Sequence, residues 1–306
     1  MGATFDWKVY GLVLRFGAVF YFDEVNTMKL GVSSYSFSKY MKQTGADLFE
    51  VACLARGLGF DAIEFTELKV DDPLSYAAAL RRHCESLGLE VTAYAVGMNL
   101  LKGDAEENVA KLCLCADVAA ALGAHVMRHD VCSALPEGVS WEEGIDRMVP
   151  LIRRVTAYAK TLGVRTCSEN HGYIYQDSAR VKRLIDAVDD PNYRWLLDIG
   201  NFLCADEDPR SAVEVALPYV VHVHLKDFLY RKVDGEGPLP TGFFKTRNNN
   251  LLRGTALGHG DVPVFACVKR LRDAGYDGAL SLEFEGAEEN LPALRMGIAY
   301  MKALTV

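Results

Sequence analysis

Acidic and imidazole side chains recur where four successive β-rich runs of the sequence end. These side chains are Glu169, Asp198, His224 and Glu283. Carboxylate oxygens and imidazole nitrogens bind divalent metal ions, and carboxylates also act as general acids and bases. The pattern therefore points to metal-assisted proton transfer, provided that the four run ends meet at one place.

The rest of the chain contains the elements needed to bring these ends together. From Met28 onward, short β-rich runs alternate with helical patterns, and five of the helix-to-strand junctions carry a glycine suited to a left-handed C-cap. Strands alternating with helices in this number predict a single-domain α/β fold, the (β/α)8 TIM barrel, with a doubly wound open sheet as the alternative. The eight predicted strands are 29–34, 61–66, 90–96, 125–129, 164–169, 194–198, 220–224 and 279–283.

All strands of such a barrel end at the face where active sites lie. Three unpaired carboxylates at one mouth would repel each other unless a cation neutralised them. Three carboxylates and one imidazole predict one divalent metal ion, with Mn²⁺ favoured and Mg²⁺, Co²⁺, Fe²⁺ or Zn²⁺ as alternatives. A single acidic residue at a strand end is commonly a helix N-cap or a solvated loop residue, but that reading does not explain four in succession.

Other polar residues near the strand ends are expected to contact a substrate. Lys226 shares strand parity with His224 and is predicted to donate to a substrate oxygen, an ion pair with a surface carboxylate being the alternative. His171 and His129 are predicted to bind substrate hydroxyls or to support the metal ligands, unless they are ordinary loop histidines. Glu64, near the end of the second strand, could bind a substrate hydroxyl or simply pair with a basic neighbour, and it is left out of the predicted site.

Composition narrows the class of partner. The chain has 306 residues, with 41 Asp and Glu against 33 Lys and Arg. This acidic balance argues against a nucleic-acid partner, which would need clustered basic residues, and favours a small neutral or metal-screened ligand. Eight scattered cysteines without a secretory signal predict reduced thiols in a cytoplasmic protein.

Two segments depart from the regular pattern. Residues 1–27 are predicted to be an N-terminal extension, either a hairpin against the barrel or an artefact of start-site choice. Its apolar run is too short to span a membrane and could contribute to contact in a homo-oligomer. The barrel is assigned to 28–306, with a long loop after the seventh strand at about 228–260. Within this stretch GHGD predicts a turn, with Asp261 as the N-cap of the next helix.

Several stretches together resemble the sugar isomerase/epimerase group of the xylose isomerase-like TIM barrels. This group includes ketose 3-epimerases, inosose and dehydroshikimate dehydratases and, more distantly, the metal-dependent AP endonucleases. The resemblance extends from residue 28 to the C-terminus. Its carriers are SENHG (168–172), LLDIGNF (196–202), HVHLKD (222–227), GHGDV (258–262) and GYDGALSLEFE (275–285).

The resemblance implies that the four strand-end residues hold one divalent metal and that Glu169 and Glu283 also serve as acid and base. Where the ketose epimerases have a histidine three residues after the metal aspartate, this chain has Asn201. Their arginine has its nearest counterpart in Arg231, displaced by one residue. Both positions are predicted to bind substrate, and both departures weaken the case for a simple ketose epimerase. The nuclease branch needs several more histidines than this chain offers.

The leading hypothesis is a divalent-metal-dependent isomerase or epimerase that acts on a ketose or keto-sugar. It would abstract a proton next to a metal-bound carbonyl and pass through an enediolate. The alternative is a dehydratase or other lyase acting on an oxidised sugar or cyclitol, because the same carbanion expels water if a leaving hydroxyl lies beside it. A third hypothesis is a non-catalytic sugar-binding barrel subunit. In each case the expected partner is a small carbohydrate, with neither nucleic acid nor membrane.

Overall fold

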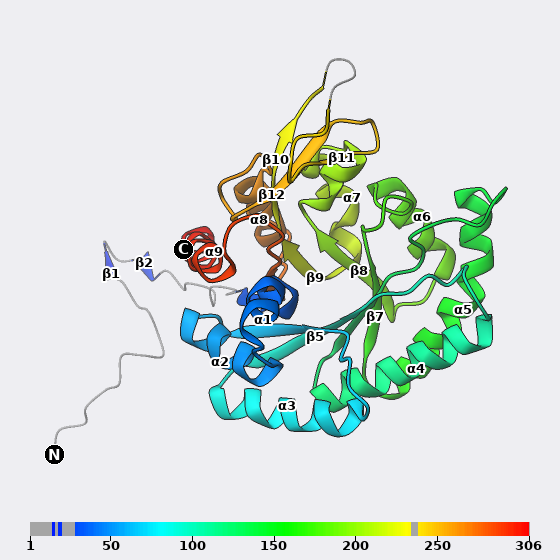
Figure 1. Cartoon of the computed structure of the whole chain (residues 1–306), viewed down its shortest axis with the longest axis horizontal. Coiled ribbons are helices and arrows are strands. Elements are labelled where there is room, and N and C mark those ends of the chain that lie inside the picture. Colours follow the sequence, from blue (N-terminus) through cyan, green and yellow to red (C-terminus); the bar gives the residue numbers. More distant parts are fainter. Residues whose placement is uncertain (1–13, 16–17, 20–27, 234–237, 306) are drawn as a thin grey trace.

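A computed structural model describes residues 14–15, 18–19, 28–233 and 238–305 (Figure 1). The two-residue strands β1 (Leu14–Arg15) and β2 (Ala18–Val19) pair in antiparallel orientation as a short hairpin. The rest of the predicted extension at 1–27, including its expected packing against the barrel, lies outside the described residues.

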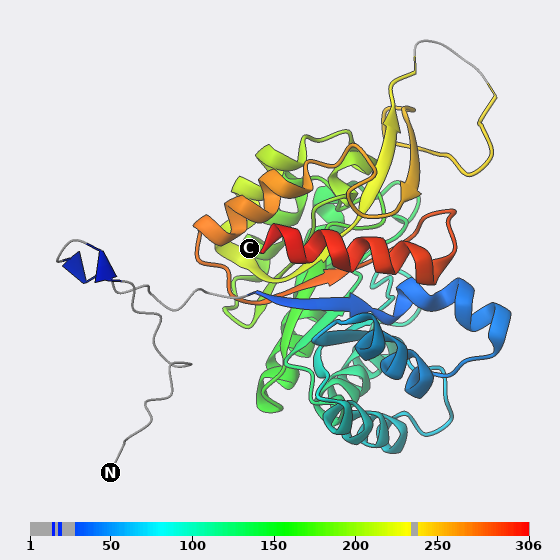
Figure 2. The same ribbon diagram turned by 90° about the vertical axis from the view of Figure 1, so that its left-hand side faces the viewer.

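Eight parallel strands close into a barrel, which confirms the predicted fold (Figures 1 and 2). Strands that follow one another in the chain are neighbours in the barrel, and the last pairs with the first, Leu280 lying opposite Leu30. Each strand agrees with its predicted run to within one residue at either end. The strands are β3 (Lys29–Ser33), β4 (Ala62–Thr66), β5 (Glu90–Val96), β6 (Val126–His129), β7 (Arg165–Glu169), β8 (Tyr193–Asp198), β9 (Val220–Leu225) and β13 (Ala279–Leu282).

Helices cover the outside of the barrel (Figure 1). Six of them, α2 to α7, follow an Asp or Ser whose side chain accepts a hydrogen bond from a backbone N–H of the first turn. The five predicted junction glycines all have φ between 64° and 97°, as a left-handed C-cap requires. The helices are α1 (Ser38–Thr44), α2 (Leu48–Leu58), α3 (Pro73–Leu87), α4 (Ala105–Leu122), α5 (Trp141–Thr161), α6 (Ser178–Val188), α7 (Pro209–Ala216), α8 (Val264–Asp273) and α9 (Asn290–Leu304), with short 3-10 turns at Ser34–Phe37, Asn201–Ala205 and Leu217–Tyr219.

A small buried apolar cluster lies inside the barrel and consists of Ala93, Val126, Cys167 and Leu196. Polar and charged side chains lie nearer the C-terminal ends of the strands. A much larger apolar core lies between the barrel and the helices. All eight cysteines are free. Within the described part of the chain, no helix combines the length and the apolar character needed to cross a membrane.

The connection predicted as a long loop at about 228–260 contains a three-stranded antiparallel sheet, which we call the arm. Its strands are β10 (Asp227–Arg231), β12 (Leu251–Thr255) and β11 (Phe244–Lys245), in that order. The arm projects beyond the barrel (Figures 1 and 2). Part of this connection is therefore strand rather than loop. The barrel strands were predicted from their alternation with helices, and no helix lies between β10 and β12 among the described residues, so this pattern gave no signal for the arm.

Asp227 ties the base of the arm to the chain that follows it. Its buried carboxylate accepts hydrogen bonds from the backbone N–H groups of Phe228, Gly258 and Gly260, each at 2.9 Å, and of Val262 at 3.2 Å. A Cβ on Gly260 would lie 2.2 Å from that carboxylate, so only glycine permits this close approach. The predicted GHGD turn (258–261) therefore folds around the carboxylate of Asp227.

Asp261 does not cap the helix that follows this turn, and that prediction was wrong. The N-cap of α8 is Pro263. The Oδ2 atom of Asp261 instead accepts a hydrogen bond from the backbone N–H of Tyr230 at 2.7 Å. Asp261 therefore holds a strand of the arm in place, although it was predicted to cap α8.

We expect Asp227→Asn to lower the free energy of unfolding by roughly 3 kcal/mol. Asparagine would present one acceptor oxygen and one NH₂ group to four N–H donors, so buried donors would lose their partner. Urea unfolding measures the change. Asp277→Asn, at an exposed position, is the matched control and should change stability by less than about 0.5 kcal/mol. Equal effects in both variants would contradict this account.

Candidate metal centre

The four residues predicted as metal ligands lie together at the C-terminal end of the barrel. Glu169 ends β7, Asp198 ends β8, His224 lies near the end of β9 and Glu283 directly follows β13. One ligand atom from each lies within 4.8 Å of the others, and all four residues are buried. The strand register explains this meeting, because Asp198 and Ser281 both pair with His224.

His224 stands at the middle of the cluster. Its Nδ1 atom lies 3.5 Å from Oε1 of Glu169, 3.5 Å from Oε2 of Glu283 and 3.9 Å from Oδ2 of Asp198. This Nδ1 and Oδ2 of Asp198 are buried and make no hydrogen bond, although Nζ of Lys226 lies 3.3 Å from that Oδ2. Because buried polar atoms normally have partners, this arrangement fits a bound cation. Three carboxylates with one imidazole suit a divalent metal ion.

Lys226 brings a positive charge to the carboxylates. Its Nζ atom lies 2.6 Å from Oε2 of Glu283, 3.2 Å from Oε1 of Glu285 and 3.3 Å from Oδ2 of Asp198. Lys226 is itself buried. It therefore points into the cluster, as its strand parity predicted, and pairs with acidic residues of the site.

Burial and charge act in opposite directions on the carboxyl groups of the cluster. Burial, only partly offset by Lys226, raises the pKa of Asp198 to about 6. Burial also opposes ionisation of Glu283, but attraction to Lys226 and to a neighbouring imidazole outweighs it and holds the pKa of Glu283 well below its ordinary value. Burial also opposes ionisation of Glu169, but Arg128 and the imidazole of His224 together outweigh it and lower the pKa of Glu169. Both glutamates are thus ionised at neutral pH.

Backbone and amide groups hold Asp198 in place. Its Oδ1 atom accepts hydrogen bonds from the N–H groups of Gly200 and Asn201, both at 2.8 Å. The side chain of Asn170 accepts from the Asp198 N–H at 3.0 Å and donates to its carbonyl at 2.8 Å. Asn201 also donates through Nδ2 to Oε1 of Glu169 at 3.1 Å. The predicted substrate-binding residue Asn201 therefore lies directly beside the ligands.

A second set of charged residues reaches the cluster from the end of β6. Arg128 lies with Nε 3.0 Å from Oε2 of Glu169 and with Nη1 3.1 Å from Oδ1 of Asp130. The same Oδ1 lies 3.0 Å from Nδ1 of His171. Burial alone would lower the pKa of His171, but Asp130 outweighs burial and raises it to about 9. His171 is therefore charged at neutral pH, and its side chain is 44% exposed at the mouth.

The structure does not bring His129 to the cluster. Arg128 occupies the inward position of β6, so strand alternation directs His129 to the outer side of the barrel. Its buried ring lies 5.9 Å from the ring of Tyr193. The expected contact with substrate therefore does not agree with this position. The parity rule applied to the other strand ends would have selected Arg128 instead.

Arg231 also lies apart from the ligands. It is an exposed residue at the end of β10 on the arm, where its guanidinium stacks 5.1 Å from the ring of Phe243. Its sequence position close to His224 suggested the site, but the chain turns outward into the arm between them. Its substrate-binding role receives no support from this placement.

The position of His129 leads to a prediction about stability. Burial lowers the pKa of His129 to about 4, whereas an unfolded histidine titrates near about 6.5. Between these values the unfolded chain binds more protons, so stability falls as the pH falls through this window. We expect a loss of about 2 kcal/mol from this residue between pH 7 and pH 5.

Urea unfolding at these two pH values provides the measurement. His129→Gln should remove most of this loss, whereas His125→Gln, at an exposed position in the same segment, should leave it in place. A wild-type pH dependence in the His129 variant would show that burial of this imidazole is not its cause.

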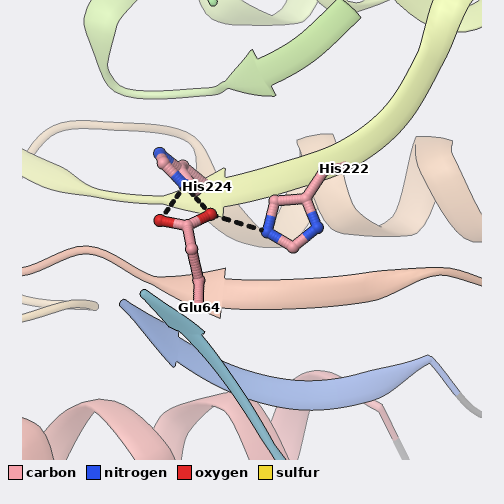
Figure 3. A group of neighbouring side chains, drawn as sticks. All are labelled: Glu64, His222 and His224. Carbon is pink, nitrogen blue, oxygen red and sulfur yellow. Dashed lines mark hydrogen bonds and ion pairs between the residues drawn. The ribbon is translucent and has the colours of Figure 1, made fainter. Parts of the chain in front are cut away.

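Glu64 belongs to the site although it was left out of the prediction. It lies on β4 and is fully buried, with Oε1 and Oε2 3.1 Å and 2.9 Å from Nε2 of His224 (Figure 3). Oε2 also lies 3.1 Å from Nε2 of the buried His222. Burial opposes its ionisation, but the two histidines outweigh burial and hold the pKa of Glu64 far below its ordinary value. Strand parity places Glu64 inward, which was the one sequence feature that could have indicated it.

Comparison with known proteins gives a family for this chain. A family model described as a xylose isomerase-like TIM barrel matches residues 53–304. The inosose dehydratase of Clostridium perfringens (strain 13 / Type A) is 26% identical over 164 residues, which are 53% of this chain and 50% of that protein. The inosose dehydratase of Bacillus thuringiensis (strain Al Hakam) is 22% identical over 273 residues, 85% of this chain and 90% of that protein. This chain thus spans about half the length of the first relative and most of the second.

Solved structures share the same barrel. The probable 3-DHS dehydratase AsbF of Bacillus anthracis has a TM-score of 0.69 and 19% identity, and the match covers 90% of this chain and 99% of that chain. The D-psicose 3-epimerase of Clostridium cellulolyticum H10 has a TM-score of 0.68 and 17% identity, with 91% of this chain and 99% of that chain covered. At these identities the likeness concerns the fold.

Proposed function

The chain belongs to the xylose isomerase-like TIM barrel family, and we propose that it is a divalent-metal-dependent enzyme acting on a small sugar or cyclitol that carries a carbonyl group. One observation carries the proposal: three buried carboxylates and one imidazole face one another beside Lys226 at the C-terminal end of the barrel. The reaction would begin with removal of a proton from the carbon next to the carbonyl. Relatives named inosose dehydratase support a substrate of this class.

The metal ion would be held by Glu169, Asp198, His224 and Glu283. When bound, it would polarise the substrate carbonyl and make the neighbouring C–H more acidic. The ligand set favours Mn²⁺, with Mg²⁺, Co²⁺, Fe²⁺ or Zn²⁺ as alternatives.

The protein groups around the ligands would carry out the proton transfer. Glu169 and Glu283 are ionised and would accept the substrate proton, while Arg128 and Lys226 keep them charged. His171 is a charged donor at the exposed mouth and would deliver a proton to a substrate oxygen. The buried position of the cluster would keep bulk water away from the carbanion.

We favour loss of water as the outcome. A leaving hydroxyl needs a proton, and the protonated imidazole of His171, which pairs with Asp130 at the exposed mouth of the barrel, would supply it. Epimerisation, the leading hypothesis from the sequence, becomes the second candidate. It is favoured by the presence of two carboxylates, Glu169 and Glu283, each 3.5 Å from the same Nδ1 atom of His224, since one could remove a proton and the other return it.

The test is incubation of the Mn²⁺-loaded protein in D₂O with a panel of inososes, keto-sugars and ketoses. Dehydration predicts loss of water and a new carbon–carbon double bond next to the carbonyl, which absorbs in the ultraviolet. Deuterium in recovered substrate or in its epimer, without loss of water, would support the second candidate. Saturable binding without either change would overturn both and favour a non-catalytic sugar-binding barrel. Protein stripped with EDTA is the control and should give no turnover.

A further inference from the structure

Glu64 crosses the inside of the barrel to meet the histidine of the candidate metal centre. It lies on β4, whereas His224 lies on β9, and strands β3 and β13 separate the two. Both carboxylate oxygens are within hydrogen-bond distance of Nε2 of His224, at 3.1 Å and 2.9 Å (Figure 3). Glu64 is completely buried, so this contact replaces water as the partner of a charged group.

The contact determines which nitrogen of His224 faces the metal ligands. A neutral imidazole has one N–H donor and one nitrogen that accepts. A carboxylate next to Nε2 favours the proton on Nε2, which leaves the lone pair on Nδ1. That Nδ1 is the atom lying 3.5 Å from Glu169 and from Glu283, and it has no hydrogen-bond partner.

We propose that Glu64 is a positioning residue that holds His224 in the Nε2–H tautomer and directs its Nδ1 lone pair at the metal ion. The inference rests on the proposed metal-dependent function. A carboxylate that accepts the second N–H of a ligating histidine fixes the ring and makes the ligand more basic. His222 places a second imidazole beside the same carboxylate, with its Nε2 3.1 Å from Oε2 of Glu64.

A second metal ion between Glu64, His222 and His224 is the competing explanation, since these three also offer ligand atoms within 4.8 Å of one another. It would require His224 to bind one ion through each nitrogen, with no proton left on the ring. A hydrogen bond needs no such deprotonation and satisfies both oxygens of Glu64. The positioning role is therefore the simpler account of the same distances.

The experiment uses the full chain, freed of metal with EDTA and titrated with Co²⁺, and follows the heat of binding and the visible absorption of Co²⁺. We expect one equivalent bound to the wild type, with affinity about tenfold weaker in Glu64→Gln and about a hundredfold weaker in Glu64→Leu. Glutamine keeps an acceptor for the imidazole N–H and leucine removes it. His222→Gln, which keeps a donor for Glu64, is the control and should change affinity by less than about threefold.

A second measurement reads the tautomer directly. In metal-free protein labelled with ¹⁵N-histidine, at a pH high enough for the His224 ring to be neutral, the wild-type shifts of His224 should be those of the Nε2–H form, and Glu64→Leu should give a mixture. A residue that only supported the fold would alter unfolding without altering this spectrum. Circular dichroism establishes that each variant is folded.

The outcomes separate this inference from the proposed function. A wild-type protein that binds no Co²⁺ would overturn the proposed function, while the tautomer measurement would still decide the role of Glu64. Wild-type Co²⁺ affinity and an unchanged tautomer in folded Glu64 variants would overturn the inference alone. Two equivalents bound to the wild type, one of them lost in the His222 and Glu64 variants, would overturn it in favour of the second metal ion.

Discussion

Replacement of Glu283 by glutamine will slow exchange of the substrate proton with solvent by about a thousandfold or more. Glutamine has nearly the same size and can still accept a hydrogen bond from Lys226, whose Nζ lies 2.6 Å away. It cannot take up a proton at neutral pH, so the variant loses one of its two bases. The measurement is deuterium incorporation from D₂O at saturating Mn²⁺. The Mn²⁺ affinity of the variant is measured in parallel, because Glu283 is also a proposed ligand.

Glu214→Gln is the matched control for this experiment. Glu214 makes an exposed ion pair with Arg270 on the outer helices, and its replacement should leave the exchange rate unchanged. Glu169→Gln should behave like the Glu283 variant, since both carboxylates face the same imidazole nitrogen. Full activity of Glu283→Gln with bound Mn²⁺ would rule out the scheme with two carboxylate bases.

Replacement of Asp198 by alanine will weaken Mn²⁺ binding by at least about a hundredfold. Its Oδ2 atom is buried, makes no hydrogen bond and faces the other proposed ligands, so its removal would take away a proposed metal ligand. Mn²⁺ at a hundred times its dissociation constant should stabilise the wild type by about 2.7 kcal/mol, visible as a higher melting temperature. The alanine variant should show little or no such rise.

Asp198→Asn separates the loss of the ligand charge from damage to the fold. Its side-chain oxygen can still accept from the N–H groups of Gly200 and Asn201, which now hold Oδ1. We expect this variant to fold like the wild type and yet to bind Mn²⁺ far more weakly. If either variant responded to Mn²⁺ as the wild type does, Asp198 would not be a ligand.

The barrel was open to prediction because its determinants are local. Alternation of strands and helices, together with glycines after helices, follows from neighbouring residues, and each strand agreed with its prediction to within one residue. The ends of β7, β8, β9 and β13 could be aligned before the structure, because parallel strands of a barrel end at one face. The arm was missed, since no helix separates β10 from β12 among the described residues and the strand–helix alternation therefore gave no signal for it.

Contacts around the ligands were harder to predict. Arg128 and His129 are adjacent in the sequence, and a one-residue difference in strand parity decides which of them points inward. Lys226 was expected at the mouth, yet its three acidic partners lie on β8 and after β13. Such pairings depend on where several strands converge, and no local pattern encodes that.

The sequence by itself determined the fold class and the four residues that converge on the candidate metal centre, because strand periodicity and strand ends are properties of short segments. Only the tertiary structure decided that Glu64 meets His224 and that Arg128, in place of His129, meets Glu169. Glu64 and His224 are 160 positions apart, and closure of the barrel brings them within hydrogen-bond distance. The physical reason is that candidate ligands can be recognised from residue type and position at a strand end. The residues that orient these ligands and keep them ionised come from distant strands, and only closure of the barrel brings them together.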